Sequence, residues 1–141
     1  MKQESFDRAA LVATLEKLKN NGLVGIFPEG HRSEDGELME FEQGLGLIAI
    51  KSRAPIIPCG VAGAYQMMKP HTSGVRKSHL ELHFGPPVDV SDLYGSADQR
   101  QAYAEVARRA HSAVARLLAE AREAREAWSR QQEGQVSGNP S

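Results

Sequence analysis

Apolar positions follow two patterns along this chain, and the two patterns alternate. Apolar residues that recur every three or four positions predict an amphipathic helix, and a short unbroken apolar run between turn residues predicts a buried strand. The predicted helices cover residues 6–19, 43–52 and 98–130, and the predicted strands cover residues 23–27, 56–61 and 80–84. Because strands alternate with helices, we expect an α/β fold in which helices flank a mixed sheet.

The last predicted helix has a narrow apolar side that is rich in alanine and includes Tyr103, Val106 and Leu117. Such a side could lie on a membrane, but its small residues favour packing on the sheet or on a partner helix. We therefore place one domain over residues 1–130 and a disordered tail over residues 131–141.

The composition is typical of one compact domain, with 141 residues, 40% of them hydrophobic, 25% charged, and a formal net charge of −1. No apolar run approaches the ~20 residues of a membrane-spanning helix, and the first residues do not form a signal peptide. We expect a cytoplasmic protein and leave a peripheral contact with a membrane open. The near-neutral charge and the lack of an aromatic platform argue against nucleic-acid binding. The single cysteine, Cys59, is expected to be a buried, inert thiol.

The turn after the first predicted strand concentrates charged and flexible residues. Pro28 lacks an N–H and ends the strand, and Gly30 permits backbone torsions that are closed to other residues. Ligands bind at the carboxyl ends of strands in open α/β sheets, and the planar fork of Arg32 suits a phosphate. We predict an anion site here, with an ordinary solvated loop as the alternative.

The same residues carry a family resemblance. The sequence Phe27-Pro28-Glu29-Gly30-His31-Arg32-Ser33 resembles the third signature block of the glycerolipid acyltransferases, which include the 1-acyl-glycerol-3-phosphate acyltransferases. Three later segments, 41–49, 54–58 and 79–87, are similar to the family's following helix, its fourth block and its last core strand with a G-P-P turn. His31 departs from the family, which usually has threonine there. The resemblance covers about residues 8–118.

The resemblance implies a glycerol-3-phosphate acyltransferase-like fold and an enzyme of phospholipid biosynthesis. Such an enzyme transfers a fatty acyl group from acyl-CoA or acyl-carrier protein to a lysophospholipid acceptor, and no cofactor is implied. The residues implied in substrate binding form one turn: Glu29, Gly30, His31, Arg32 and Ser33. Arg32 would contact the acceptor phosphate, Ser33 would add a hydroxyl, Glu29 would shape the pocket, and Gly30 would let backbone N–H groups approach an oxygen. His31 would reach the acceptor or merely replace threonine.

The family's first block, H-x-x-x-x-D, has no counterpart in this chain. None of the five histidines has an aspartate five positions later, and His31 with Asp35 is one residue too close. This block supplies the general base and its orienting carboxylate, so we assign no catalytic residue here. We expect an N-terminally truncated acyltransferase fragment with little activity of its own. The alternative is a non-catalytic phosphate-binding or scaffold remnant, with one sheet edge and an apolar face left uncovered.

Two further polar groups have alternative interpretations. His79, Glu81 and His83 alternate along the last predicted strand and share a face, which is a geometry able to bind zinc. We favour a solvent-facing polar side opposite Leu80, Leu82 and Phe84, and predict no metal. A basic segment could meet acidic headgroups or an acidic carrier protein, or simply be a solvated loop; it comprises Lys69, His71, Arg76 and Lys77.

Overall fold

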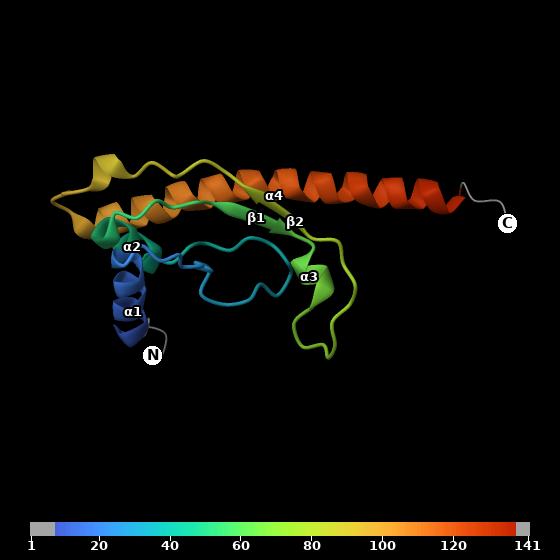
Figure 1. The fold of residues 1–141 in the computed structure, drawn as a ribbon, viewed down its shortest axis with the longest axis horizontal. Helices are drawn as coiled ribbons and strands as arrows, with labels where there is room; N and C mark the ends of the chain where they lie inside the picture. Colours follow the sequence, from blue (N-terminus) through green and yellow to red (C-terminus); the bar gives the residue numbers. More distant parts are fainter. Residues whose placement is uncertain (1–7, 138–141) are drawn as a thin grey trace.

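The computed structural model describes residues 8–137, and Figure 1 shows the order of the elements. They are α1 (Arg8–Lys19), α2 (Gly44–Ser52), β1 (Cys59–Ala62), α3 (Ala64–Met67), β2 (Glu81–Phe84), a 3-10 turn (Ser91–Leu93) and α4 (Gln99–Ser137). The predicted helices over 6–19 and 43–52 are confirmed as α1 and α2, although residues 6 and 7 lie outside the described part. No helix within residues 8–137 is both long enough and apolar enough to cross a bilayer.

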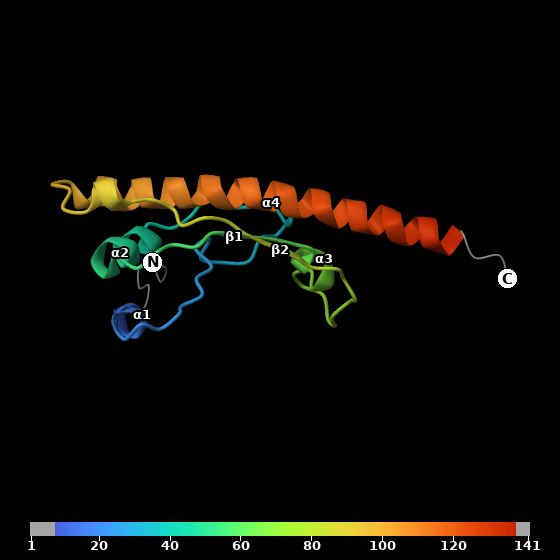
Figure 2. The same ribbon diagram turned by 45° about the horizontal axis from the view of Figure 1, so that its top comes forward.

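Helix α4 is the element on which β1, β2 and α2 pack, while α1 packs on α2. Its 39 residues extend about 58 Å at about 1.5 Å per residue. Strands β1 and β2 lie along its middle, and α2 lies against its N-terminal part (Figures 1 and 2). Ala107 of α4 is buried, and the other buried residues of this helix recur at helical spacing: Ala102, Val106, Ala110, Leu117 and Ala121. We predicted that the alanine-rich side packs on the sheet or on a partner helix, and within the described residues it packs on the sheet and on α2.

Glycines allow α2 and β1 to approach α4 closely. A Cβ on Gly46 of α2 would lie 2.4 Å from the Tyr103 backbone, and a Cβ on Gly60 of β1 would lie 2.4 Å from the Leu118 backbone nitrogen. Both distances are far shorter than a van der Waals contact, so only glycine fits. The backbones therefore meet directly, without intervening side chains.

The end of the chain differs from the prediction. Helix α4 continues to Ser137, so the prediction of a disordered tail from residue 131 is wrong for residues 131–137, while residues 138–141 lie outside the described part. Gln131, Gln132 and Glu133 are good helix formers, and they outweigh the cost of about 1 kcal/mol of Gly134 in a helix interior. Gly134 therefore does not end the helix.

The predicted buried strand over residues 23–27 is also absent. This segment has no regular secondary structure, and Leu23 and Phe27 are 92% and 89% exposed. An apolar run becomes a strand only where a neighbouring strand satisfies its backbone hydrogen bonds. Among the described residues no strand pairs with it, because the sheet consists of β1 and β2 alone.

Strands β1 and β2 pair antiparallel, with Val61 opposite Leu82 and Cys59 opposite Phe84. The structure thus combines helices with a small antiparallel sheet, and the mixed sheet that we predicted is not seen within residues 8–137. The strands predicted over 56–61 and 80–84 are found as β1 and β2, although β1 begins three residues later and ends one residue later than predicted, and β2 begins one residue later.

The orientation predicted for the last strand is reversed. His79, Glu81 and His83 lie on the side that faces α4, where the His79 ring stacks on Trp128 with centroids 4.1 Å apart and an angle of 7° between the rings. The opposite side carries Phe84, which is 68% exposed. The expectation that the polar side faces solvent is wrong, because the polar groups of this side satisfy one another and the helix covers them.

Candidate functional site

The predicted anion site lies on an exposed loop that closes on itself. The backbone N–H of Glu42 donates to the Pro28 carbonyl over 2.8 Å, and the N–H of Gly30 donates to the Phe27 carbonyl over 3.4 Å. Gly30 has a φ of 76°, and the Glu42 carboxylate occupies the space that a Cβ would need. Glycine is thus required at this position for two independent reasons.

Glu29 stabilises the loop from within. Its Oε2 accepts a hydrogen bond from the backbone N–H of Met39 over 3.0 Å, and the contact is partly buried. Because Glu29 and Met39 are ten residues apart, this hydrogen bond joins two distant parts of the loop. This geometry supports the shaping role that the family resemblance implies for Glu29.

Ser33 and Asp35 form a second local network. Asp35 Oδ1 accepts hydrogen bonds from the Glu37 backbone N–H and from the Ser33 hydroxyl, each 2.9 Å long. These two donors, the backbone one first, lower the pKa of Asp35. The Ser33 hydroxyl is therefore directed at Asp35, while His31 is exposed on the loop.

Arg32 connects the loop to another part of the chain. Its Nη2 donates to the Met68 carbonyl over 2.9 Å, just after α3. The Tyr65 hydroxyl donates to the Glu34 carbonyl over 3.1 Å, so the same segment is held at a second point. Arg32 is exposed and has no ion pair among the described residues, which leaves most of its guanidinium donors available.

All five predicted residues thus lie on one turn, but they do not all point to one centre. Arg32 keeps free donors, whereas Glu29 and Ser33 bond within the loop. Sequence reasoning missed two supporting residues, Asp35 and Glu42. The Asp35-Gly36 pair is an aspartate-glycine turn signal from which the first could have been found.

The histidine and glutamate side chains of β2 form a hydrogen-bonded group. Nε2 of His79 lies 2.6 Å from Oε1 of Glu81, and Nε2 of His83 lies 3.1 Å from Oε2. These contacts, led by that of His79, lower the pKa of Glu81. Within residues 8–137 no group of side chains has the arrangement of a metal site.

The free thiol of Cys59 is partly buried, and burial raises its pKa. A higher pKa means less thiolate at neutral pH, which does not favour a nucleophile.

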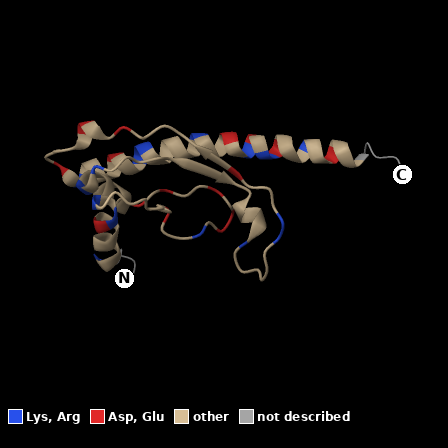
Figure 3. Cartoon of the chain, viewed as in Figure 1, with Lys and Arg blue, Asp and Glu red and all other residues tan. Residues whose placement is uncertain are grey.

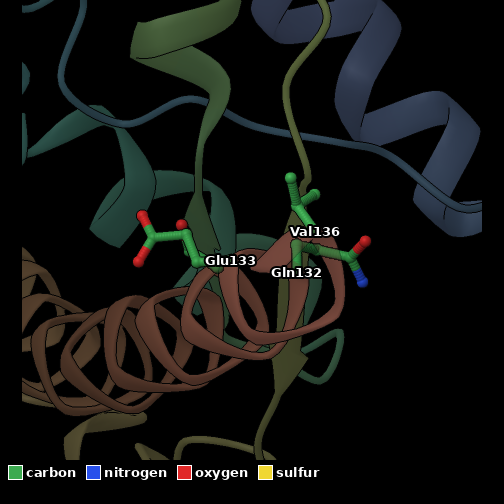
Figure 4. A pocket seen from close by; sticks show the side chains of 4 residues that line it. Gln132, Glu133 and Val136 are labelled. Carbon is green, nitrogen blue, oxygen red and sulfur yellow. The ribbon is translucent and has the colours of Figure 1, made fainter. Parts of the chain in front are cut away.

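A shallow hollow of about 390 Å³ lies near the C-terminal end of α4, where Ser129, Gln132, Glu133 and Val136 line it (Figure 4). All of its lining residues belong to one helix, so it brings no distant side chains together.

Comparison with known proteins supports the family resemblance. A family model described as Acyltransferase matches residues 2–62, which include the whole candidate turn. A 1-acyl-sn-glycerol-3-phosphate acyltransferase of Limnanthes douglasii is 35% identical over 74 residues, which are 52% of this chain and 26% of the relative. The enzyme of the same name from Cocos nucifera is 34% identical over 98 residues, or 63% of this chain and 32% of the relative.

A solved structure agrees with these matches. The crystal structure of PlsC from Thermotoga maritima, a 1-acyl-sn-glycerophosphate (LPA) acyltransferase, is 31% identical and superposes with a TM-score of 0.54. The match covers 73% of this chain and 43% of PlsC. The chain belongs to the glycerolipid acyltransferase family.

This member of the glycerolipid acyltransferases spans about a quarter to a third of the length of these plant relatives. The Acyltransferase match ends at Ala62, the last residue of β1. The structural match to PlsC covers more of the chain than that family model does. The turn with Arg32 lies within residues 2–62, which the Acyltransferase family model matches.

Proposed function

We propose that this chain provides the acceptor-phosphate part of a lysophosphatidic acid acyltransferase site. In this proposal the acceptor is a 1-acyl-glycerol-3-phosphate, the donor is a fatty acyl thioester of coenzyme A or acyl-carrier protein, and the product is phosphatidic acid. The observation that carries the proposal is Arg32, an exposed guanidinium without an ion pair among the described residues, on a turn that matches the family. A guanidinium binds a phosphate through two parallel hydrogen bonds, which a lysine cannot reproduce.

The geometry of the loop supports this role for Arg32. Glu29 and Glu42 brace the loop from inside, and the Met68 carbonyl holds one nitrogen of Arg32. A side chain restrained in this way loses less conformational entropy when it binds a ligand than a freely rotating one does. His31 and Ser33 lie beside it and would make secondary contacts with the acceptor.

We expect the isolated chain to have little or no transferase activity. His31 and Asp35 do not replace the missing dyad, because the Asp35 carboxylate bonds to Glu37 and Ser33. General acid–base catalysis typically contributes about 10²–10⁴-fold, and a chain without it should fall short of an intact relative by about that factor. An assay of the purified chain with lysophosphatidic acid and acyl-CoA tests this. Turnover comparable to that of an intact acyltransferase would contradict it.

Binding tests the proposal without requiring catalysis. We expect Arg32→Ala to weaken the binding of glycerol 3-phosphate by about 10-fold or more, because a hydrogen bond to a charged group contributes about 1.5–3 kcal/mol. Arg32→Lys should restore only part of the affinity, since it keeps the charge but loses the fork. Titration calorimetry measures both, with Arg130→Ala on the exposed surface of α4 as the control. Equal affinities for the wild type and Arg32→Ala would refute the site.

A non-catalytic scaffold is the second candidate, and the apolar side of the sheet favours it. Val61 and Leu82 lie opposite each other on the side that α4 does not cover, and Phe84 extends it. We infer that in a complete acyltransferase this side is covered and the β1–β2 pair is part of a larger mixed sheet. A scaffold would bind a partner there with no dependence on Arg32, whereas an acyltransferase fragment completed by another chain would need Arg32 for turnover.

A further inference from the structure

A cleft of about 720 Å³ lies between α4 and the segment that follows α3. Residues from both sides line it: Met67, Val75, Arg76, Lys77, Arg125 and Trp128. The two sides are about fifty residues apart in the sequence. The cleft is separate from the turn that carries Arg32, although Arg32 bonds to Met68 next to one of the lining residues.

Hydrogen bonds and a ring contact fix the positions of the residues that line the cleft. Nε of Arg125 donates to the His79 carbonyl over 3.0 Å, and its Nη2 donates to the Ser78 hydroxyl over 3.3 Å. Trp128 stacks on the His79 ring. Neutral oxygens therefore position Arg125, and they do not cancel its positive charge.

The lining of the cleft includes three cations and no carboxylate, although the whole chain has a net charge of −1. No aspartate or glutamate occurs between Glu42 and Glu81. Within residues 8–137, none of the cations Arg76, Lys77 and Arg125 takes part in an ion pair. Figure 3 shows basic positions on the segment after α3 and both basic and acidic positions on the adjacent part of α4.

Apolar side chains are exposed beside these cations. Of the apolar residues that line the cleft, Val75 is 66% exposed and Trp128 is 40% exposed. An exposed tryptophan next to arginine and lysine is typical of surfaces at the boundary between water and lipid, where the ring enters the headgroup layer and the cations meet phosphates.

We propose that this cleft docks the protein on an anionic phospholipid surface. Arg76, Lys77 and Arg125 bind headgroup phosphates, while Val75 and Trp128 insert among the headgroups. The proposal depends on the charge and exposure of the cleft and on no step of acyl transfer. It can therefore fail or succeed independently of the role of Arg32.

An acidic carrier protein is a weaker match to this surface. Carrier recognition would use the cations but would leave the tryptophan and valine without a defined role. A lipid surface uses both kinds of side chain at once. The exposed valine and tryptophan therefore favour a lipid surface over an acidic carrier protein as the binding partner of the cleft.

Trp128 makes the test direct, because it is the only tryptophan in the chain. The full chain is titrated with vesicles of phosphatidylcholine alone and with vesicles that also contain phosphatidylglycerol. We expect Trp128 emission to shift to shorter wavelength with the anionic vesicles only, and brominated lipid to quench it. Binding should weaken in 1 M salt, where charges are screened over about 3 Å.

Variants that lack two cations of the cleft test whether this surface binds the vesicles. Each cation near an anionic membrane contributes about fivefold in affinity, so Arg76→Gln with Lys77→Gln should reduce vesicle binding about 30-fold. Both residues are exposed, so the substitutions should leave the fold intact, which circular dichroism checks. The control is Lys17→Gln with Lys19→Gln, an equal loss of charge on the exposed surface of α1, which should change binding little.

Several results would overturn the proposal. The first two are absence of binding to anionic vesicles and equal binding to both kinds of vesicle. The others are an unshifted Trp128 emission in the bound state and an equal loss of vesicle binding in the cleft double variant and in the α1 double variant. Binding of acyl-carrier protein through Arg76 and Lys77 without vesicle binding would assign the cleft to an acidic protein instead.

Discussion

Arg109 of α4 connects this helix to the 3-10 turn through its guanidinium. It donates to both carboxylate oxygens of Asp92, over 2.6 and 2.8 Å, and to Glu105 over 2.9 Å. Glu105 also receives two hydrogen bonds from Arg108. With Arg108 contributing first and Arg109 second, these contacts lower the pKa of Glu105 from 4.5 to about 2. The start of α4 is thereby joined to the turn before it.

The lowered pKa of Glu105 predicts a pH dependence of stability. Because the folded-state pKa lies below the ordinary value, the ionised carboxylate stabilises the fold above about pH 4.5. This contribution is lost progressively as the pH falls from about 4.5 to about 2. We expect the difference in unfolding free energy between the wild type and Glu105→Gln to shrink over this range in urea titrations.

Glu120→Gln is the matched control for this measurement. Glu120 is an exposed carboxylate of the same helix and has no ion pair among residues 8–137. Its substitution should produce no comparable change between pH 4.5 and pH 2. A Glu105→Gln difference that stays constant with pH would show that the ion pairs do not stabilise the fold.

At the scale of elements, close backbone contacts attach α2 and β1 to α4. Alanines on α4 and glycines on its partners leave no side-chain layer between them, so the contact tolerates little added volume. The same arrangement explains why a helix with so few large apolar residues still has a buried face.

Gly46→Ala tests this close approach. The new methyl group would overlap the Tyr103 backbone, so we expect a loss of about 1–3 kcal/mol in unfolding free energy. Gly134→Ala is the control, because outside the local helix backbone its new Cβ would meet nothing within 4 Å. Helix propensity alone then predicts a gain of up to about 1 kcal/mol. Chemical denaturation measures both, and a Gly46→Ala variant as stable as the wild type would mean that α2 and α4 are farther apart.

At the scale of the whole molecule, one side of the sheet is covered by α4 and the other is open. The covered side holds polar residues of β2 and small residues of β1, and the open side holds larger apolar ones. This distribution is the reverse of that of a self-contained two-layer domain, in which the apolar side of a sheet is buried. We therefore expect the open side to be a surface for association.

We expect the isolated chain to self-associate through this side of the sheet. Removing a large apolar side chain from water contributes about 1.5–3 kcal/mol, so Leu82→Ser with Phe84→Ser should weaken association markedly. Sedimentation velocity over a range of concentrations measures it. Val136→Ser removes an exposed apolar residue from the end of α4 and should have little effect. A wild-type chain that stays monomeric at high concentration would contradict the expectation.

The sequence alone determined the positions of α1, α2 and α4, the turn with Arg32, and the family resemblance that the comparisons support. These features depend on neighbours a few positions apart, where helical spacing and turn residues act locally. The tertiary structure decided which side of β2 is covered, that residues 23–27 do not form a strand, and that Arg125 and Trp128 meet residues 75–79. Each of these outcomes depends on a partner distant in the chain, and periodicity along a segment cannot identify that partner.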